Sequence, residues 1–156
     1  MLYLYLFILI TIFFEDFKER KVHVFLLLTF VLLGGIVFYQ NTFLELYLLS
    51  ITLNFSFLLF LILCLWGYTK FKLKLPFFSA IGLGDLLFFT GLAVAFPTIN
   101  FLILFVSSLL FSLLLFVIMK SRMKYKTVPL AGFQAIFLFL ILLLNLMFDI
   151  VNLYTI

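Results

Sequence analysis

The sequence has few of the residues from which many soluble enzymes build their active sites. Its 156 residues include one cysteine, Cys64, and one histidine, His23. A single cysteine excludes an internal disulfide and a multi-cysteine zinc site, and a lone histidine has no companion for a histidine-based metal site. We therefore predict no bound metal, a packing role for Cys64 and a surface or interfacial role for His23.

Charged residues are also scarce. Only 10% of the residues are charged, whereas 68% are hydrophobic and 25 are phenylalanine. A soluble domain of this size could not hide so much apolar surface from water. Apolar runs of about 18 or more residues with few charges are typical of membrane helices. We expect one all-α domain, residues 1–156, embedded in the lipid bilayer with no separate soluble module.

Apolar runs between polar breaks predict six transmembrane helices. They cover residues 2–14, 22–39, 46–68, 77–96, 99–119 and 128–148. The first run is short for a hydrocarbon core of about 30 Å, so we expect that helix to continue through Phe17.

The basic residues predict the orientation of these helices. All ten Lys and Arg lie in segments 18–21, 70–74 and 120–126, which follow the first, third and fifth helices. The positive-inside rule places these segments in the cytoplasm and both chain termini outside. The net charge of +4 follows from this orientation in a cell membrane, so we predict no nucleic-acid partner.

The predicted topology sorts the six acidic residues. They are Glu15, Asp16, Glu19, Glu45, Asp85 and Asp149. Glu45 and Asp149 are expected on the outer side. Asp16 and Asp85 are expected at similar depth near the cytoplasmic face, with Gly82 and Gly84 allowing close approach of backbone or substrate to Asp85.

Two carboxylates at close range suit acid–base chemistry on a peptide bond. Repulsion and burial favour one protonated and one ionised group, which can polarise the carbonyl and activate water. The alternative is that Asp85 only stabilises a helix N-terminus and that Asp16 is one charge in a solvated cluster. Ionisable residues within a membrane favour the functional interpretation.

Three short motifs resemble the type IV prepilin peptidases, membrane aspartyl proteases with a G-x-G-D signature. "GLGD" covers residues 82–85, "DFKERKVH" covers 16–23, and "VPLAGFQAIF" resembles the family's proline-containing start of the last helix. The resemblance implies an aspartic-type endopeptidase with Asp16 and Asp85 as catalytic residues, supported by Gly82, Gly84 and Arg20. It further implies that the partners are prepilin-like precursors, cleaved behind their leader at the cytoplasmic membrane face without a cofactor.

The chain departs from the family pattern at two positions. His23 stands where the family usually has proline, and Leu87 stands where a lysine commonly follows the motif aspartate. The resemblance is to the short forms, which lack the N-terminal region with cysteine pairs. Two other functions stay open at this point: a small proton-coupled transporter, which usually has inverted repeats, and a catalytically silent membrane scaffold.

The protease interpretation also makes predictions about geometry. Asp85 should lie at the start of the fourth helix, with Gly82 and Gly84 in an irregular segment that faces the first helix. The basic segment 69–75 is expected to be a loop that could act as a mobile lid. Gln134 could reach the site or could instead form an interhelical hydrogen bond. Nothing in the sequence predicts an oligomeric state.

Overall fold

The computed structural model describes residues 2–74, 76–120, 128–148 and 153–154. Every regular element in these ranges is helical, which confirms the predicted all-α class. The elements are α1 (Leu2–Glu19), α2 (Val24–Gln40), α3 (Leu44–Tyr68), η1 (Thr69–Leu73), α4 (Phe77–Ala80), α5 (Leu83–Ala95), α6 (Thr98–Met119) and α7 (Leu130–Phe148). The first helix continues past Phe17, as predicted.

Three of the described helical segments are long and apolar enough to cross a membrane. They are Leu44–Leu73, which joins α3 and η1, Thr98–Met119 and Leu130–Phe148. Large apolar side chains also cover much of the outer surface; Phe25 and Ile118, for example, are 75% and 72% exposed. Such a surface is costly in water and favourable in lipid, so the helices indicate a membrane protein.

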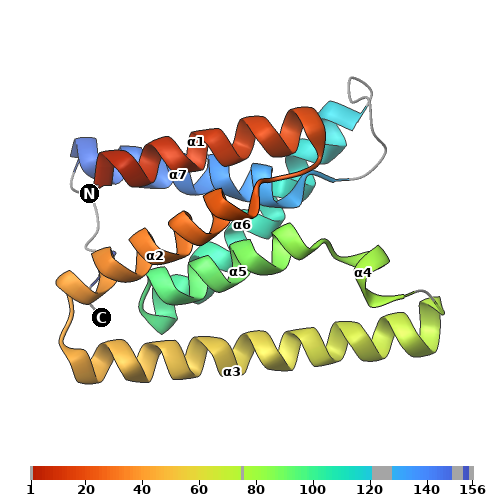
Figure 1. Cartoon of the computed structure of the whole chain (residues 1–156), viewed down its shortest axis with the longest axis horizontal. Coiled ribbons are helices and arrows are strands. Elements are labelled where there is room, and N and C mark those ends of the chain that lie inside the picture. Colours follow the sequence, from red (N-terminus) through yellow and green to blue (C-terminus); the bar gives the residue numbers. More distant parts are fainter. Residues whose placement is uncertain (1, 75, 121–127, 149–152, 155–156) are drawn as a thin grey trace.

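The helices form a bundle with two chemically different ends (Figure 1). α2 packs most extensively on α5, and α1 packs on α7. α1 ends where α5 and α7 begin. Basic residues lie at this end: Lys18 in the last turn of α1, Lys70 and Lys72 in that of η1, and Lys120 at the C-cap of α6. We call this the basic end. The start of α1 and the end of α7 lie together at the opposite end.

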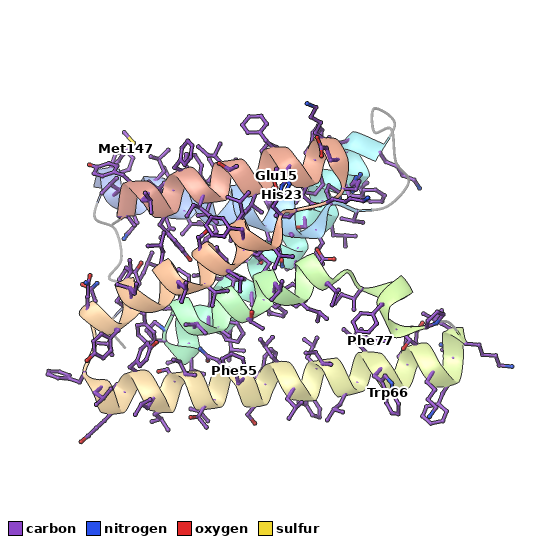
Figure 2. All side chains as sticks on the ribbon, viewed as in Figure 1. Glu15, His23, Phe55, Trp66, Phe77 and Met147 are labelled. Atoms are coloured by element: carbon purple, nitrogen blue, oxygen red, sulfur yellow. The ribbon has the colours of Figure 1, made fainter. Side chains whose placement is uncertain are left out.

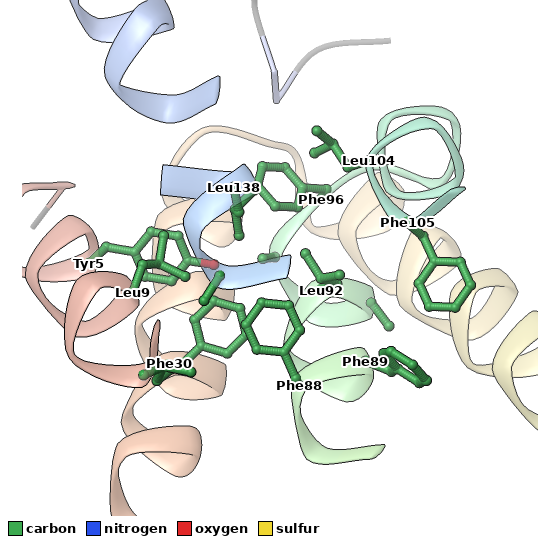
Figure 3. Packing of buried hydrophobic residues seen from close by; sticks show 14 of the residues in the cluster. Tyr5, Leu9, Phe30, Phe88, Phe89, Leu92, Phe96, Leu104, Phe105 and Leu138 are labelled. Carbon is green, nitrogen blue, oxygen red and sulfur yellow. The ribbon is translucent and has the colours of Figure 1, made fainter. Parts of the chain in front are cut away.

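Three stacked aromatic rings join α1, α2 and α5 in the core (Figure 3). The ring of Phe30 lies between those of Tyr5 and Phe88, at centroid distances of 5.3 and 4.8 Å. All three side chains are buried. Phe30 also covers Gly91, which lies one turn after Phe88 on α5. The missing side chain at Gly91 therefore lets α2 approach α5 closely, as small residues do in membrane bundles.

The predicted fourth helix, residues 77–96, is wrong as a single element. α4 ends at Ala80, Ile81 is extended with φ −136° and ψ 132°, and α5 begins at Leu83 behind the N-cap Gly82. The 13 residues of α5 span roughly 20 Å, which is shorter than a hydrocarbon core of about 30 Å. The break explains how Asp85 comes to lie at the start of a helix, below the basic end.

The basic segment after α3 is helical from Thr69 to Leu73, so the predicted loop is wrong over these residues, and Leu75 lies outside the described residues. The chain continues through η1, which is a π-helix. The backbone stays helical here because the segment 69–73 contains no glycine or proline. The Nζ of Lys70 lies 4.7 Å from the ring centroid of Trp66, and that of Lys72 lies 5.5 Å from Tyr68. Paired aromatic rings and lysines are typical of a membrane interface.

Candidate functional site

Asp16 lies in the last turn of α1, and its side chain is buried although it is charged in water. Its Oδ2 accepts a hydrogen bond of 2.6 Å from the backbone N–H of Gly132 at the start of α7. Arg20 ends α1 in the left-handed conformation, with φ 56°, and its N–H donates to the Asp16 carbonyl at 3.1 Å. The positive charge of Arg20 attracts the negative charge of the ionised Asp16 carboxyl group.

Asp85 lies in the first turn of α5 and joins two helix N-termini. Its Oδ2 accepts a hydrogen bond of 3.3 Å from the backbone N–H of Gly82, the N-cap of its own helix. Its Oδ1 accepts a hydrogen bond of 3.0 Å from the backbone N–H of Ala131 in α7. The first contact is the helix-capping role expected as the alternative from the sequence; the second goes beyond it, because it reaches another helix.

The two carboxyl groups therefore meet at α7. Their donors, Ala131 and Gly132, are consecutive residues, and consecutive Cα atoms are about 3.8 Å apart. When both carboxyl groups are ionised, the negative charge of Asp16 repels that of Asp85. The first N–H groups of a helix lack intrahelical partners and form the positive end of its dipole. The first turn of α7 is thus the feature that allows the buried Asp16 and the half-buried Asp85 to lie side by side. We call them the acid pair.

A long apolar groove opens beside Asp85. Its volume is about 870 Å³, and Asp85 is the charged residue in its described lining. The main wall residues are Leu61 and Leu65 of α3, Leu109 and Leu113 of α6, and Phe89 and Phe105, whose rings meet edge to face at 5.0 Å. Thr69 and Phe77 line it at the basic end. Asp85 therefore lies in the wall of a groove that is otherwise lined mainly by apolar side chains.

Asn54 holds α3 against α5 at the end of α5 that lies away from the groove. Its side chain is fully buried, and its Nδ2 donates to the carbonyl groups of Ala93 at 2.8 Å and Phe96 at 3.0 Å. These carbonyl groups lie at the C-terminal end of α5, where helical carbonyls lack intrahelical donors. α3 is therefore fastened to α5 far from Asp85, and the groove occupies the space between α3 and the shorter α5 near the basic end (Figure 1).

The two motif glycines do not face α1, contrary to the prediction. A methyl group on Gly84 would meet Leu27 of α2 at 3.9 Å, and one on Gly82 would meet Oδ2 of Asp85 at 3.2 Å. The reason is that α5 packs on α2, whereas α1 packs on α7. Gly82 supplies the N-cap hydrogen bond to Asp85, and Gly84 lies in ordinary contact with a neighbouring helix.

Other residues singled out from the sequence have partners outside the acid pair. Leu87 packs against the hydrophobic cluster. It lies two residues after Asp85, and residues two apart on a helix do not share a face. Gln134 is buried and its Nε2 donates to Ser108 Oγ at 3.1 Å, which is the interhelical hydrogen bond expected as one alternative from the sequence. Glu45 lies in the first turn of α3, at the other end of the helix that reaches the groove at Thr69. Asp149 lies outside the described residues.

Glu15 fixes the turn between α1 and α2, a role that the sequence analysis missed (Figure 2). Its Oε2 accepts a hydrogen bond of 3.0 Å from the backbone N–H of His23, and its Oε1 lies 2.9 Å from His23 Nδ1. The φ of His23 is −62°, close to the value of about −65° that a proline ring imposes. At the position where the family usually has proline, two contacts with Glu15 therefore hold His23 at a φ that a proline ring would also impose.

This substitution of contacts for a ring can be tested by a double-mutant cycle. We expect Glu15→Ala to lower the free energy of unfolding by about 1 kcal/mol. In a His23→Pro background the same change should cost little, because the hydrogen bonds are already gone and the ring fixes φ. Thermal unfolding in detergent of the two single variants and the double variant measures the coupling. Strictly additive effects would show that Glu15 does not act through His23.

Comparison with models of protein families, with curated proteins and with solved structures gives no match.

Proposed function

We propose that this chain is a membrane aspartyl endopeptidase that uses Asp16 and Asp85 as its catalytic residues. One observation carries the proposal. Two acids from separate helices converge on consecutive backbone amides of α7, at the edge of an apolar groove. A helix-capping role accounts for one contact of Asp85 and does not account for the buried Asp16 beside it. Two carboxyl groups placed in this way can act as an acid–base dyad.

The proposed reaction is hydrolysis of a peptide bond by a shared-proton pair. The ionised carboxylate removes a proton from water as the water oxygen attacks the carbonyl carbon of the peptide bond. The protonated carboxyl group donates a hydrogen bond to the carbonyl oxygen. The tetrahedral intermediate collapses when the C–N bond breaks and the amine nitrogen takes up the proton that the base carboxylate had removed from water, which restores the starting protonation of the pair. Because the two groups titrate as a pair, base and acid are assigned to the pair and to neither residue alone.

The groove favours an apolar segment as the substrate. Its walls are mainly leucine and phenylalanine side chains, and the polar side chains in its described lining are those of Asp85 and Thr69. An apolar stretch in the groove would bring the backbone that precedes it to the acid pair. Together with the motif resemblance, this supports prepilin-like precursors, in which a short leader precedes a hydrophobic helix, as the substrates.

Co-expression with candidate precursors tests the proposed function. We expect a prepilin-like precursor to be shortened when this chain is present, seen as a gel shift, with a new N-terminus at the start of its hydrophobic segment by N-terminal sequencing. A panel of such precursors that all stay intact beside a well-expressed chain would contradict the proposal.

The proposed orientation, with six spans, the basic end in the cytoplasm and both termini outside, has its own test. In a Cys64→Ser background, we expect Gln40→Cys to react with an impermeant thiol reagent from outside intact cells. Lys72→Cys and Lys124→Cys should react only after the cells are opened; Lys124 lies outside the described residues. The reason is that all ten Lys and Arg lie in three segments of the sequence, which the positive-inside rule places in the cytoplasm. Labelling of Lys72→Cys from outside would place the acid pair on the wrong face for a cytoplasmic protease.

A further inference from the structure

The first turn of α7 holds both acids by backbone groups that have no other role in the helix. The helical ladder of α7 begins with a hydrogen bond of 3.0 Å from the N–H of Phe133 to the carbonyl of Pro129. The N–H groups of Ala131 and Gly132 precede it and so lack intrahelical acceptors. They donate to Asp85 Oδ1 and Asp16 Oδ2 instead. One peptide unit of α7 therefore sets the separation of the two carboxyl groups.

The side chain missing from Gly132 makes the closer of these contacts possible. A methyl group there would lie 2.9 Å from Asp16 Cβ and 3.0 Å from Asp16 Oδ2. Such distances are too short for ordinary packing. Asp16 is buried near the end of α1, which packs along α7, so its carboxyl group would have to leave the Gly132 N–H.

We propose that Ala131 and Gly132 position the acid pair for catalysis, through the N–H of Ala131 and through both the N–H and the bare Cα of Gly132. This inference rests on the proposed function for its catalytic meaning. α7 orients one oxygen of each acid and leaves Asp16 Oδ1 and the weakly held Asp85 Oδ2 to meet water and the peptide carbonyl. The two residues do not touch the reacting atoms, so they are positioning residues.

Replacing the Ala131 amide by an ester tests the contact to Asp85 alone. Lactic acid in place of alanine at position 131 keeps the methyl side chain and removes a single N–H. We expect kcat for a precursor to fall about 10- to 100-fold, as for loss of a hydrogen bond to a charged group, with KM little changed. The matched control is the same ester at Ala135, one turn on, whose N–H belongs to the helical ladder. There we expect lower thermal stability and an unchanged kcat.

Gly132→Ala tests the contact to Asp16. We expect a loss of kcat of about 100-fold or more with KM little changed, because the carboxyl group is displaced and its hydrogen bond is broken. Gly67→Ala is the matched control, since a methyl group there meets nothing within 4 Å. A Gly132→Ala enzyme with normal kcat would overturn the role of Gly132, and equal losses of kcat for the esters at 131 and 135 would overturn the role of the Ala131 N–H.

An infrared measurement separates this inference from the proposed function. The carboxyl bands of the acid pair are assigned as those lost in Asp16→Asn and Asp85→Asn. We expect the Asp85 band to shift in the 131 ester and the Asp16 band to shift in Gly132→Ala, whether or not any precursor is cleaved. Shifted bands in a chain that cleaves nothing would keep the positioning contacts and reject the protease. Unshifted bands would reject the positioning contacts.

Discussion

Replacing either Asp16 or Asp85 by asparagine should abolish cleavage while the protein level stays unchanged. Asparagine keeps the shape and can still accept the hydrogen bond from Gly132 or Ala131, but it can neither take a proton from water nor share one with its partner. Acid–base catalysis contributes about 10²- to 10⁴-fold, so a loss of at least that size is expected. The measurement is the initial cleavage rate of a purified precursor in detergent or liposomes.

Acids elsewhere in the chain are the controls for this result. Glu45→Gln should be fully active, since Glu45 lies 24 residues before Thr69 on the helix that reaches the groove, or roughly 36 Å along its axis. Asp149→Asn should also retain activity. Glu15→Gln should be mild, because Glu15 contacts His23 and not the acid pair.

Glu19 is the most demanding control. It lies three residues after Asp16 and is exposed at the end of α1. We expect Glu19→Gln to have an intermediate effect, through the charge near the site. An active Asp16→Asn together with an inactive Glu19→Gln would show that the wrong acid of α1 has been assigned.

The pairing of the acids could be predicted from the sequence, because it needs only the order of the helices. Basic segments fix which ends of the helices lie together, and Asp16 and Asp85 then fall at the same end. The helical class and the continuation of α1 beyond Phe17 follow from composition and length in the same way. These features depend on the hydrophobicity of whole segments and not on the contacts of single atoms.

The role of α7 could not be predicted in the same way. Its contacts to Asp16 and Asp85 come from backbone N–H groups, which every residue except proline possesses. The available signals were the proline and glycine of "VPLAG", which are typical of a helix start and of a close approach. They indicate that something packs against this turn, but not that the acid pair does.

The two corrections near the groove have simple physical reasons. Segment 69–73 reads as a loop because it is basic, yet lysine is a good helix former and nothing there interrupts the backbone. Residues 77–96 read as one apolar run, yet the backbone leaves the helix at Ile81 and Gly82. Hydrophobicity places a segment in the membrane and does not locate a break inside it.

Among single methyl additions at the glycines of this chain, Gly91→Ala is expected to cause the largest loss of stability. A methyl group at Gly91 would overlap the ring of Phe30. That ring cannot move aside, because it is fully buried between Tyr5 at 5.3 Å and Phe88 at 4.8 Å. Overpacking a tight core costs about 1 to 3 kcal/mol and occasionally more. We expect a net loss in this range, even though alanine gains roughly 1 kcal/mol over glycine in a helix.

Thermal unfolding in detergent measures this loss, and two further variants identify its cause. Gly67→Ala adds the same methyl group to a helix where nothing lies within 4 Å, so its midpoint should stay the same or rise. Phe30→Leu shrinks the ring that Gly91 faces. It should destabilise the wild-type chain through a cavity but restore part of the loss in Gly91→Ala, because the two changes share one contact. If Gly91→Ala unfolds at the wild-type temperature, the close packing of α2 on α5 through Phe30 is wrong. The Asp85 helix would then be held in place by something other than the aromatic stack.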